Sequence, residues 1–407
     1  MKNLLSTISI ASCLFFLFQQ VLAQDEIFKA NPKEVERMES YLEELYRDTE
    51  ITHQFLNEFG QLISCVDIYT QPAFRHSALR NHEIQLRPSS ELLEKIKHSA
   101  TERNTQQTAF LPICPENSIP MRIYTVEDLA RFKSLEDFKY KKSPSFLKHG
   151  STTRRQGPTA LHQYAVTSRN VNNIGSRSTI NIWAPYVQQN NEFSLSQIWL
   201  VGGTGSNLET LEVGWQVYPD RNGDSNSHLF IYFTPDNYGS GGCYDLTCSG
   251  FIQTNTTIAI GATLTSSVIG GTQTEGTVAY WRDSSTGHWW LVIEDIMVGY
   301  YPTSLFDTTG IKNNATRVDY GGEILDRQTG GLHTGTDMGN GQFPVSGNAA
   351  YQRSLEYMDT SGTIQPTTSL TALIDDSLCY DLVLDSNATW GQFFNYGGRG
   401  YHNPNCE

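Results

Sequence analysis

Short apolar runs separated by turn-forming residues dominate the chain after residue 157. The runs are rich in Val, Ile, Thr, Tyr and Trp, and Gly, Asn, Asp or Pro bounds each of them, which is typical of β-strands. The predicted strands are LHQYAVTS, STINIWAPYV, SLSQIWLVGG, LEVGWQVYP, HLFIYFTP, TVAYWRD, HWWLVIEDIMVGY and ATRVDYGGEIL. Because no long helical pattern interrupts them, the pattern predicts an all-β unit, an antiparallel β-sandwich of two sheets.

A different pattern precedes this unit and predicts a smaller segment of helices and loops. Asn31, Pro32 and Glu34 form a helix start, with a capping residue, proline at the first position and an early acid. Further helices are predicted over 89–97 and 125–132. Proline-containing stretches such as IYTQPAF and QLRPSS, between the predicted helices, favour irregular structure.

The two ends of this first segment mark the domain boundaries. Residues 1–23 have a lysine, an apolar run and a small-residue end, Val21–Ala23, which predicts a cleaved secretory signal peptide. The stretch KYKKSPSFLKHGSTTRRQGPTA is basic and without periodicity, and it predicts an exposed, cleavable linker. The expected organisation is therefore a signal at 1–23, a first segment at 24–156 that ends in this linker, and a β-rich domain at 157–407.

The cysteines also indicate secretion. Six remain after the signal, an even number that predicts disulfides. Cys243 and Cys248 are expected to pair locally and Cys379 with Cys406, which leaves Cys65 with Cys114. No C-x-x-C or H-x-x-x-H pattern indicates zinc, so we expect no metal and no cofactor. Candidate N-glycosylation sites follow from the sequons at Asn255, Asn314 and Asn387.

Charge divides the chain at the linker. Residues 1–156 hold 20 acidic and 20 basic residues, whereas residues 157–407 hold 23 acidic and 9 basic ones. Neither part has the basic patch that a nucleic-acid partner requires. After signal removal no apolar run is long enough to span a membrane. An acidic, nearly lysine-free secreted domain suits an acidic extracellular setting, such as a cell wall or an acidic part of the secretory route.

Two isolated acids stand inside apolar strand patterns of the β-rich domain. Glu212 lies in LEVGWQVYP and Glu323 in VDYGGEIL. A carboxylate in such a place is costly unless it has a function. Two carboxyls that share a proton can act as general base and general acid in hydrolysis.

Polar residues near these acids are candidate donors for an oxyanion or a substrate. On a regular strand Gln216 and Tyr218 share a face with Glu212. Gln197, in SLSQIWL, is a further candidate if its strand is a neighbour. The histidines, among them His162, lie near no nucleophile motif of a Ser-His-Asp enzyme.

Longer blocks resemble a known family. CVDIYTQPAFRHSALRNHEIQLRPS and CPENSIPMRIYTVEDL are similar to the activation-peptide motifs of the neprosin family of secreted plant proteins. LETLEVGWQVYPDRNGD, LFIYFTPDNY, GCYDLTCSGFIQT, WWLVIEDIMVGYYP, VDYGGEI and GTDMGNGQFP resemble its later blocks, in the same order. Tyr320 stands where the family commonly has tryptophan, which places it as a candidate substrate contact.

The resemblance implies a zymogen in which an N-terminal prosegment inhibits a glutamic endopeptidase. The founding member cuts after proline, acts in acid and removes its own prosegment, and its two catalytic glutamates correspond to Glu212 and Glu323. A proline-rich peptide or protein is the implied substrate. Two other classes remain open from the residues: a glycan-active enzyme, since glycosidases also use two carboxyls, and a non-catalytic module that binds cell-wall carbohydrate.

Overall fold

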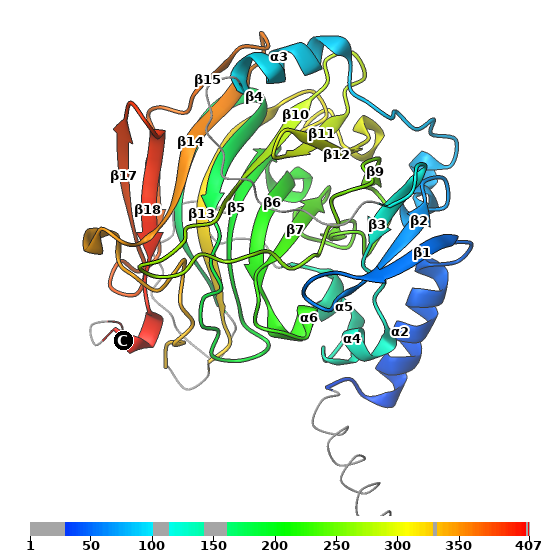
Figure 1. Cartoon of the computed structure of the whole chain (residues 1–407), viewed down its shortest axis with the longest axis horizontal. Helices are drawn as coiled ribbons and strands as arrows, with labels where there is room; N and C mark the ends of the chain where they lie inside the picture. Colours follow the sequence, from blue (N-terminus) through cyan, green and yellow to red (C-terminus); the bar gives the residue numbers. More distant parts are fainter. Residues whose placement is uncertain (1–28, 101–113, 142–160, 329–331, 404–405, 407) are drawn as a thin grey trace, which may run out of the picture.

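The computed structural model describes residues 29–100, 114–141, 161–328, 332–403 and 406. The predicted signal peptide and most of the predicted linker lie outside the described residues. No helix among the described residues is long and apolar enough to cross a bilayer. Figure 1 shows a large curled β-sheet with the N-terminal segment (residues 29–141) against one side of it.

The N-terminal segment contains helices and a small sheet. Its elements are α2 (Pro32–Leu45), β1 (Ile51–Leu56), β2 (Leu62–Asp67), α3 (Ser90–Ala100), β3 (Ser118–Met121), α4 (Val126–Ala130) and α5 (Leu135–Lys139). Asn31 caps α2 as expected, because its side chain accepts a hydrogen bond from the backbone of Glu34. The three-stranded sheet β1-β2-β3 was not anticipated, since the proline-containing stretches between the helices were interpreted as irregular.

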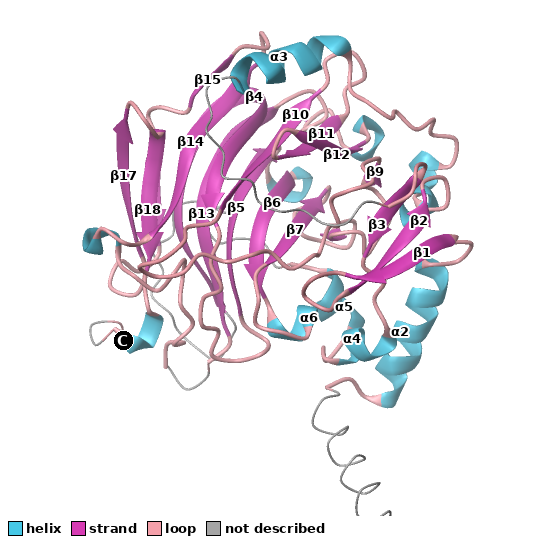
Figure 2. Ribbon diagram, in the orientation of Figure 1, coloured by secondary structure: helices cyan, strands magenta, loops and turns pink. Residues whose placement is uncertain are grey.

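The C-terminal segment (residues 161–406) is almost entirely antiparallel β-structure (Figure 2). Its strands are β4 (Leu161–Asn181), β5 (Phe193–Gly202), β6 (Glu209–Val217), β7 (His228–Thr234), β8 (Cys243–Tyr244), β9 (Ile252–Gln253), β10 (Glu275–Arg282), β11 (Trp289–Ile293), β12 (Ile296–Tyr301), β13 (Ala315–Asp326), β14 (Ala350–Asp359), β15 (Ile364–Pro366), β16 (Thr371–Ile374), β17 (Asp381–Asn387) and β18 (Gly391–Gly397). A single turn of helix, α6 (Pro219–Asn222), follows β6. The predicted all-β class is confirmed.

Two layers of this fold are joined by the long strand β4. Its first half pairs with β13 and β16, whereas its second half pairs with β10 and β14. The strand order β8-β7-β6-β5-β13-β4-β10-β11-β12-β9 therefore curls back on itself. A core that includes Trp215 of β6 and Trp289 and Trp290 of β11 fills the space between the layers. The two separate strands predicted around 161–187 are thus one strand as far as Asn181.

The long apolar run HWWLVIEDIMVGY, predicted as one strand, is a hairpin. Glu294 and Asp295 connect β11 to β12 and both have positive φ, of 48° and 63°. Two successive positive φ values are the geometry of a two-residue hairpin turn whose twist matches that of its strands. Glycine or asparagine usually marks such a turn, which is why the pattern did not indicate it.

The three disulfides are those expected from the sequence. The structure pairs Cys65 with Cys114, Cys243 with Cys248 and Cys379 with Cys406. Of the three sequon asparagines, Asn387 is exposed, while Asn255 and Asn314 are partly buried. Two of the disulfides lie in the C-terminal segment and one in the N-terminal segment, so none joins the two segments covalently.

Candidate active site

The face of the sheet that the N-terminal segment covers carries the candidate acids. Alternation along β6 sends Leu211, Val213 and Trp215 into the core between the layers, so Glu212 points to the opposite face. On β13 the core takes Ile324, and Glu323 points the other way. Both glutamates are fully buried, because the N-terminal segment lies over this face.

Strand order brings the two acids together although 111 positions separate them. β5 lies between β6 and β13, and Trp199 of β5 pairs with Glu212. Gln197 of β5 pairs with Gly214 on one side and Gly321 on the other. A Cβ atom at Gly214 would lie only 1.9 Å from the carbonyl oxygen of Ser196, so only glycine allows β5 and β6 to approach this closely.

Glu212 receives hydrogen bonds from hydroxyl groups of its own domain. Tyr238 donates to Oε1 at 2.5 Å, and Thr210 donates to the same oxygen at 3.1 Å. Both donors are neutral. Nothing in these two contacts favours the carboxylate by charge, although both satisfy its buried oxygen.

Glu323 has a different environment. Its Oε1 lies 2.5 Å from Nδ1 of His162 on the adjacent strand β4 and accepts from Tyr164 Oη at 3.1 Å. Its Oε2 accepts from Gln197 Nε2 at 3.3 Å. His162 is nearly buried, and its ring stacks parallel to that of Tyr164 at 6.3 Å. When protonated, this imidazole gives Glu323 a cationic partner that Glu212 lacks.

A lysine from the N-terminal segment lies between the two acids. Nζ of Lys141 is 2.8 Å from Oε2 of Glu212 and 2.7 Å from Oε2 of Glu323. All three side chains are fully buried. The amide of Lys141 donates to Tyr232 Oη at 3.2 Å, and Nζ lies 5.4 Å from the centroid of the Trp199 ring. The N-terminal segment therefore covers the site and also places a cation, the Lys141 ammonium, between the two glutamates.

Burial and charge act in opposite directions on the groups of this site. Burial favours the neutral acid at Glu323, but Lys141 and His162 outweigh it and lower the pKa of Glu323. Burial disfavours the Lys141 ammonium, yet Glu212 and Glu323 raise the pKa of Lys141. Burial also raises the pKa of Asp375, which accepts from the backbone of Tyr164, to about 6.

The other predicted donors are not at the pair. The Tyr218 ring packs against Phe132 and Phe193, with centroids 5.6 and 5.5 Å away. Gln216 is buried farther along β6, where it pairs with Leu195.

Tyr320 lies on the opposite face of β13, in the core. Its hydroxyl lies 2.6 Å from Ser176 Oγ and 2.8 Å from Thr367 Oγ1. It cannot contact substrate there, so the expectation drawn from its place in the sequence is wrong. Within the described residues, only Gln197 among the four predicted donors bonds to a glutamate.

Three residues of the site were missed in the sequence. Lys141 was placed in an exposed basic linker, His162 was interpreted as an ordinary polar histidine, and Tyr238 was not singled out. A strand-pairing argument would have found His162, because β4 pairs with β13 and His162 lies two residues from Tyr164, the partner of Glu323, on the same face. No local pattern marks Lys141.

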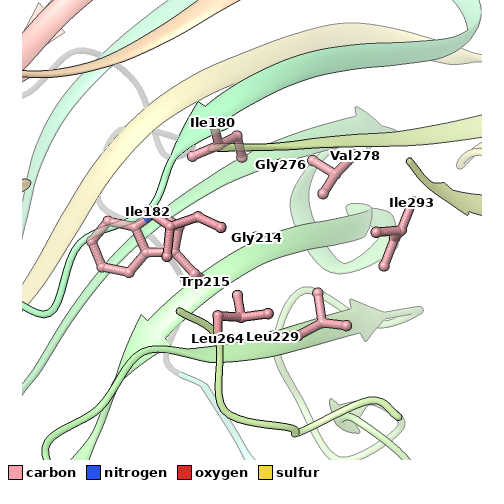
Figure 3. A pocket seen from close by; sticks show the side chains of 9 residues that line it. All are labelled: Ile180, Ile182, Gly214, Trp215, Leu229, Leu264, Gly276, Val278 and Ile293. Carbon is pink, nitrogen blue, oxygen red and sulfur yellow. The ribbon is translucent and has the colours of Figure 1, made fainter. Parts of the chain in front are cut away.

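Two other features of the described residues do not form an active site. An apolar cavity between the layers is lined by Ile180, Ile182, Gly214, Trp215, Leu229, Leu264, Gly276, Val278 and Ile293 (Figure 3). It has no titratable group. His333 lies close to Cys379 and Cys406, but these cysteines form a disulfide and have no thiolate to offer a metal.

Comparison with solved structures gives distant likenesses only. Scytalido-glutamic peptidase with a peptide-based transition-state analogue has 10% identity and a TM-score of 0.31, over 59% of this chain and 100% of that chain. SCP-B, an eqolisin peptidase with the tripeptide Ala-Ile-His, has 9% identity and a TM-score of 0.30, over the same shares. The chicken liver agglutinin CG-16 has 11% identity and a TM-score of 0.21, over 41% and 94%.

Comparison with protein families is decisive. The Neprosin activation peptide profile matches residues 55–168, which include Lys141 and His162. The Neprosin profile matches residues 190–399, which include Glu212 and Glu323, and it spans more than half of the chain. The two matches follow each other in the order that the sequence blocks predicted. The chain is a member of the neprosin family and carries the activation peptide of that family before its β-rich domain.

Proposed function

We propose that the chain is the zymogen of a secreted, acid-acting glutamic endopeptidase that cleaves peptide bonds after proline. Glu212 and Glu323 would activate the water, and the N-terminal segment would be an inhibitory prosegment. The activation-peptide match and the family support a peptidase zymogen. The proline preference rests on the resemblance of the sequence blocks. Three disulfides are consistent with a secreted protein.

The observation that carries the proposal is the position of Lys141 Nζ. This atom lies within hydrogen-bonding distance of one oxygen of each glutamate. A water molecule in the same position after prosegment release would contact both carboxyls. A general base and a general acid must both reach the reacting centre, and this position provides that geometry.

The different partners of the two acids suggest their roles. Glu323 keeps the imidazole of His162 after Lys141 has left, whereas Glu212 keeps only hydroxyl donors. In acid, Glu323 is therefore the better carboxylate and the general base, which leaves Glu212 the role of the general acid. Glu323 removes a proton from water while the oxygen of that water bonds to the scissile carbonyl carbon. Glu212 protonates the carbonyl oxygen. The tetrahedral intermediate collapses when Glu323 passes the proton taken from water to the leaving amine, the C–N bond breaks and the hydroxyl proton returns to Glu212.

Acidification of the purified precursor tests latency and activity together. Protonation of Glu323 removes a charged partner of Lys141, so a binding contribution present at neutral pH is lost as pH falls through the lowered pKa of Glu323. We expect release with a midpoint below about 4.3, the ordinary pKa of glutamic acid. The ion pair between Lys29 of the prosegment and Asp220, 2.5 Å long, should also weaken as pH falls, because protonation removes the charge of Asp220.

Mass spectrometry of that precursor, with a proline-containing peptide library added, supplies the readout. The expected result is cleavage between residues 142 and 160 and of library peptides after proline. A precursor that stays whole and cuts no peptide between pH 3 and 7 contradicts the peptidase. Cleavage of peptides at other residues alone contradicts only the proline preference.

The pH profile of His162→Gln tests the role of Glu323. Loss of the imidazolium removes one of the two groups that lower the pKa of Glu323. The acid limb of kcat/KM of the mature enzyme should then shift to higher pH, because the base becomes protonated sooner. His333→Gln is the matched control, since His333 is also buried and bonds to Gln163, outside the site. An unshifted acid limb in His162→Gln would exclude this role.

A further inference from the structure

A second set of prosegment contacts lies beside the glutamates, at the helical turn α6. Arg221 of this turn is almost completely buried, with 1% of its surface exposed. Its guanidinium donates to the main-chain carbonyl oxygen of Phe138, in the prosegment. Among the described residues, Nε and Nη1 of Arg221 have no hydrogen-bond partner. A buried cation with unused donors is poorly explained by structural packing alone.

Aromatic rings surround this guanidinium. Its Cζ lies 4.0 Å from the ring centroid of Tyr244, 4.6 Å from that of Phe138 and 5.8 Å from that of Phe132. Tyr244 belongs to the C-terminal segment, whereas both phenylalanines belong to the prosegment. Phe132 also packs edge-on against Tyr218. When the prosegment leaves, its two rings leave with it, and a pocket bounded by Arg221, Tyr218 and Tyr244 opens.

The prosegment crosses this pocket on its way to the glutamates. Arg221 holds the carbonyl of Phe138, Tyr232 holds the amide of Lys141, and the Lys141 side chain meets Glu212 and Glu323. The C-terminal domain thus makes hydrogen bonds to two main-chain groups of the prosegment, at Phe138 and Lys141, within four residues of chain. Phe138 lies in the last turn of α5 and Tyr140 is extended, so these two groups flank the point at which the chain leaves the helix. Contacts to main-chain groups do not depend on side-chain identity, so they are also available to a bound peptide of varied sequence.

We propose that the Arg221 pocket is a substrate subsite of the mature enzyme, which binds an aromatic residue of the peptide on the N-terminal side of the scissile bond. Arg221 donates to the main-chain carbonyl of that residue and stacks against its ring, as it does with Phe138. The substrate class is therefore a peptide with an aromatic residue about three positions before the residue that meets Glu212 and Glu323. This proposal rests on the peptidase function proposed above.

Peptides that differ in one position test the subsite. The parent peptide is Ala-Ala-Ala-Pro followed by a constant C-terminal part, and the scissile bond follows proline. Three variants carry phenylalanine at the second, third or fourth residue before that bond. In wild-type mature enzyme, phenylalanine at one of these positions should raise kcat/KM about tenfold over alanine, because only phenylalanine offers a ring to the guanidinium, whereas both peptides offer the main-chain carbonyl. In Arg221→Gln that ratio should fall to about twofold or less.

Controls separate the subsite from folding and from latency. Arg221→Lys keeps the charge but not the planar fork, so it should fold like wild type and also lose most of the ratio. Asn222→Ala, in the same turn, loses only its bond to Arg122 of the prosegment, 2.8 Å long, and should keep the ratio. Thermal unfolding of each mature variant checks its fold.

The results that would overturn the subsite differ from those that would overturn the enzyme. An equal loss on the alanine and phenylalanine peptides would show that Arg221 does not bind the aromatic ring. An unchanged ratio in both Arg221 variants would show that Arg221 serves only to hold the prosegment. The absence of any preference in wild type would exclude the aromatic pocket. No cleavage of any peptide by wild type would instead overturn the peptidase itself.

Discussion

Glu323→Gln should lower kcat/KM of the mature domain on a proline-containing peptide by about 10³-fold or more, since it removes the general base. Glutamine keeps the size of the side chain and one acceptor oxygen but cannot take a proton from water. Glu212→Gln should cause a loss of similar size, because the pair works as one unit and single losses are not additive. The comparison requires domains whose linker is opened by trypsin, since neither variant would process itself.

Glu209→Gln is the matched control for both substitutions. Glu209 is buried on β6 like Glu212, but its carboxylate accepts from the backbone amides of Asp307 and Ile311 instead of facing the site. It should therefore lower stability without removing catalysis. Activity of Glu323→Gln within about tenfold of wild type would contradict a role in general base catalysis. An equal loss in Glu209→Gln would point to a structural cause.

Lys141→Met should abolish most of the latency of the precursor at neutral pH. The substitution keeps the volume of the side chain but leaves two buried carboxylates without their cation. Removing one partner of a buried ion pair costs about 3–5 kcal/mol, which corresponds to a prosegment held about 10²- to 10⁴-fold more weakly. Size-exclusion chromatography at neutral pH, after trypsin has opened the linker, measures the release directly.

The same variant should also invert the pH dependence of release. In the wild type, Lys141 favours the charged form of Glu323, so acid weakens the binding of the prosegment to the domain. In Lys141→Met, Glu323 keeps only His162 as a cationic partner, so burial counts for more and lower pH should strengthen what binding remains. Lys133→Met, an exposed lysine of the same segment, should behave as wild type. If Lys141→Met and wild type release the prosegment at the same pH, Lys141 is not part of the latency mechanism.

The strand pattern predicted much of the domain because burial on both faces left it so apolar. β5, β6 and β7 are buried along their whole length, between the sandwich core on one face and the prosegment on the other. An acid in such a strand has no route to solvent, which is why Glu212 and Glu323 could be selected from residue type and context. Alternation along β6 also explains why Glu212 points away from Leu211 and Val213.

The parts that were missed depend on contacts between distant segments. Lys141 resembles other lysines of a basic stretch until the prosegment folds over the sheet. His162 acquires a meaning only through the pairing of β4 with β13. The exclusion of Tyr320 follows from its place on the core face of β13. Spacing along the chain contains none of this information, because Lys141 lies 71 positions from Glu212 and His162 lies 161 positions from Glu323.

The described residues on either side of 142–160 both reach Glu323. Lys141 precedes this stretch and His162 follows two positions after its last residue, and both side chains contact Glu323. Any bond in residues 142–160 is therefore tethered at both sides to the pair proposed to cut it. Such a tether replaces encounter by diffusion with a high effective concentration. Maturation would then be a first-order event within one molecule, equally fast in dilute and in concentrated secretions.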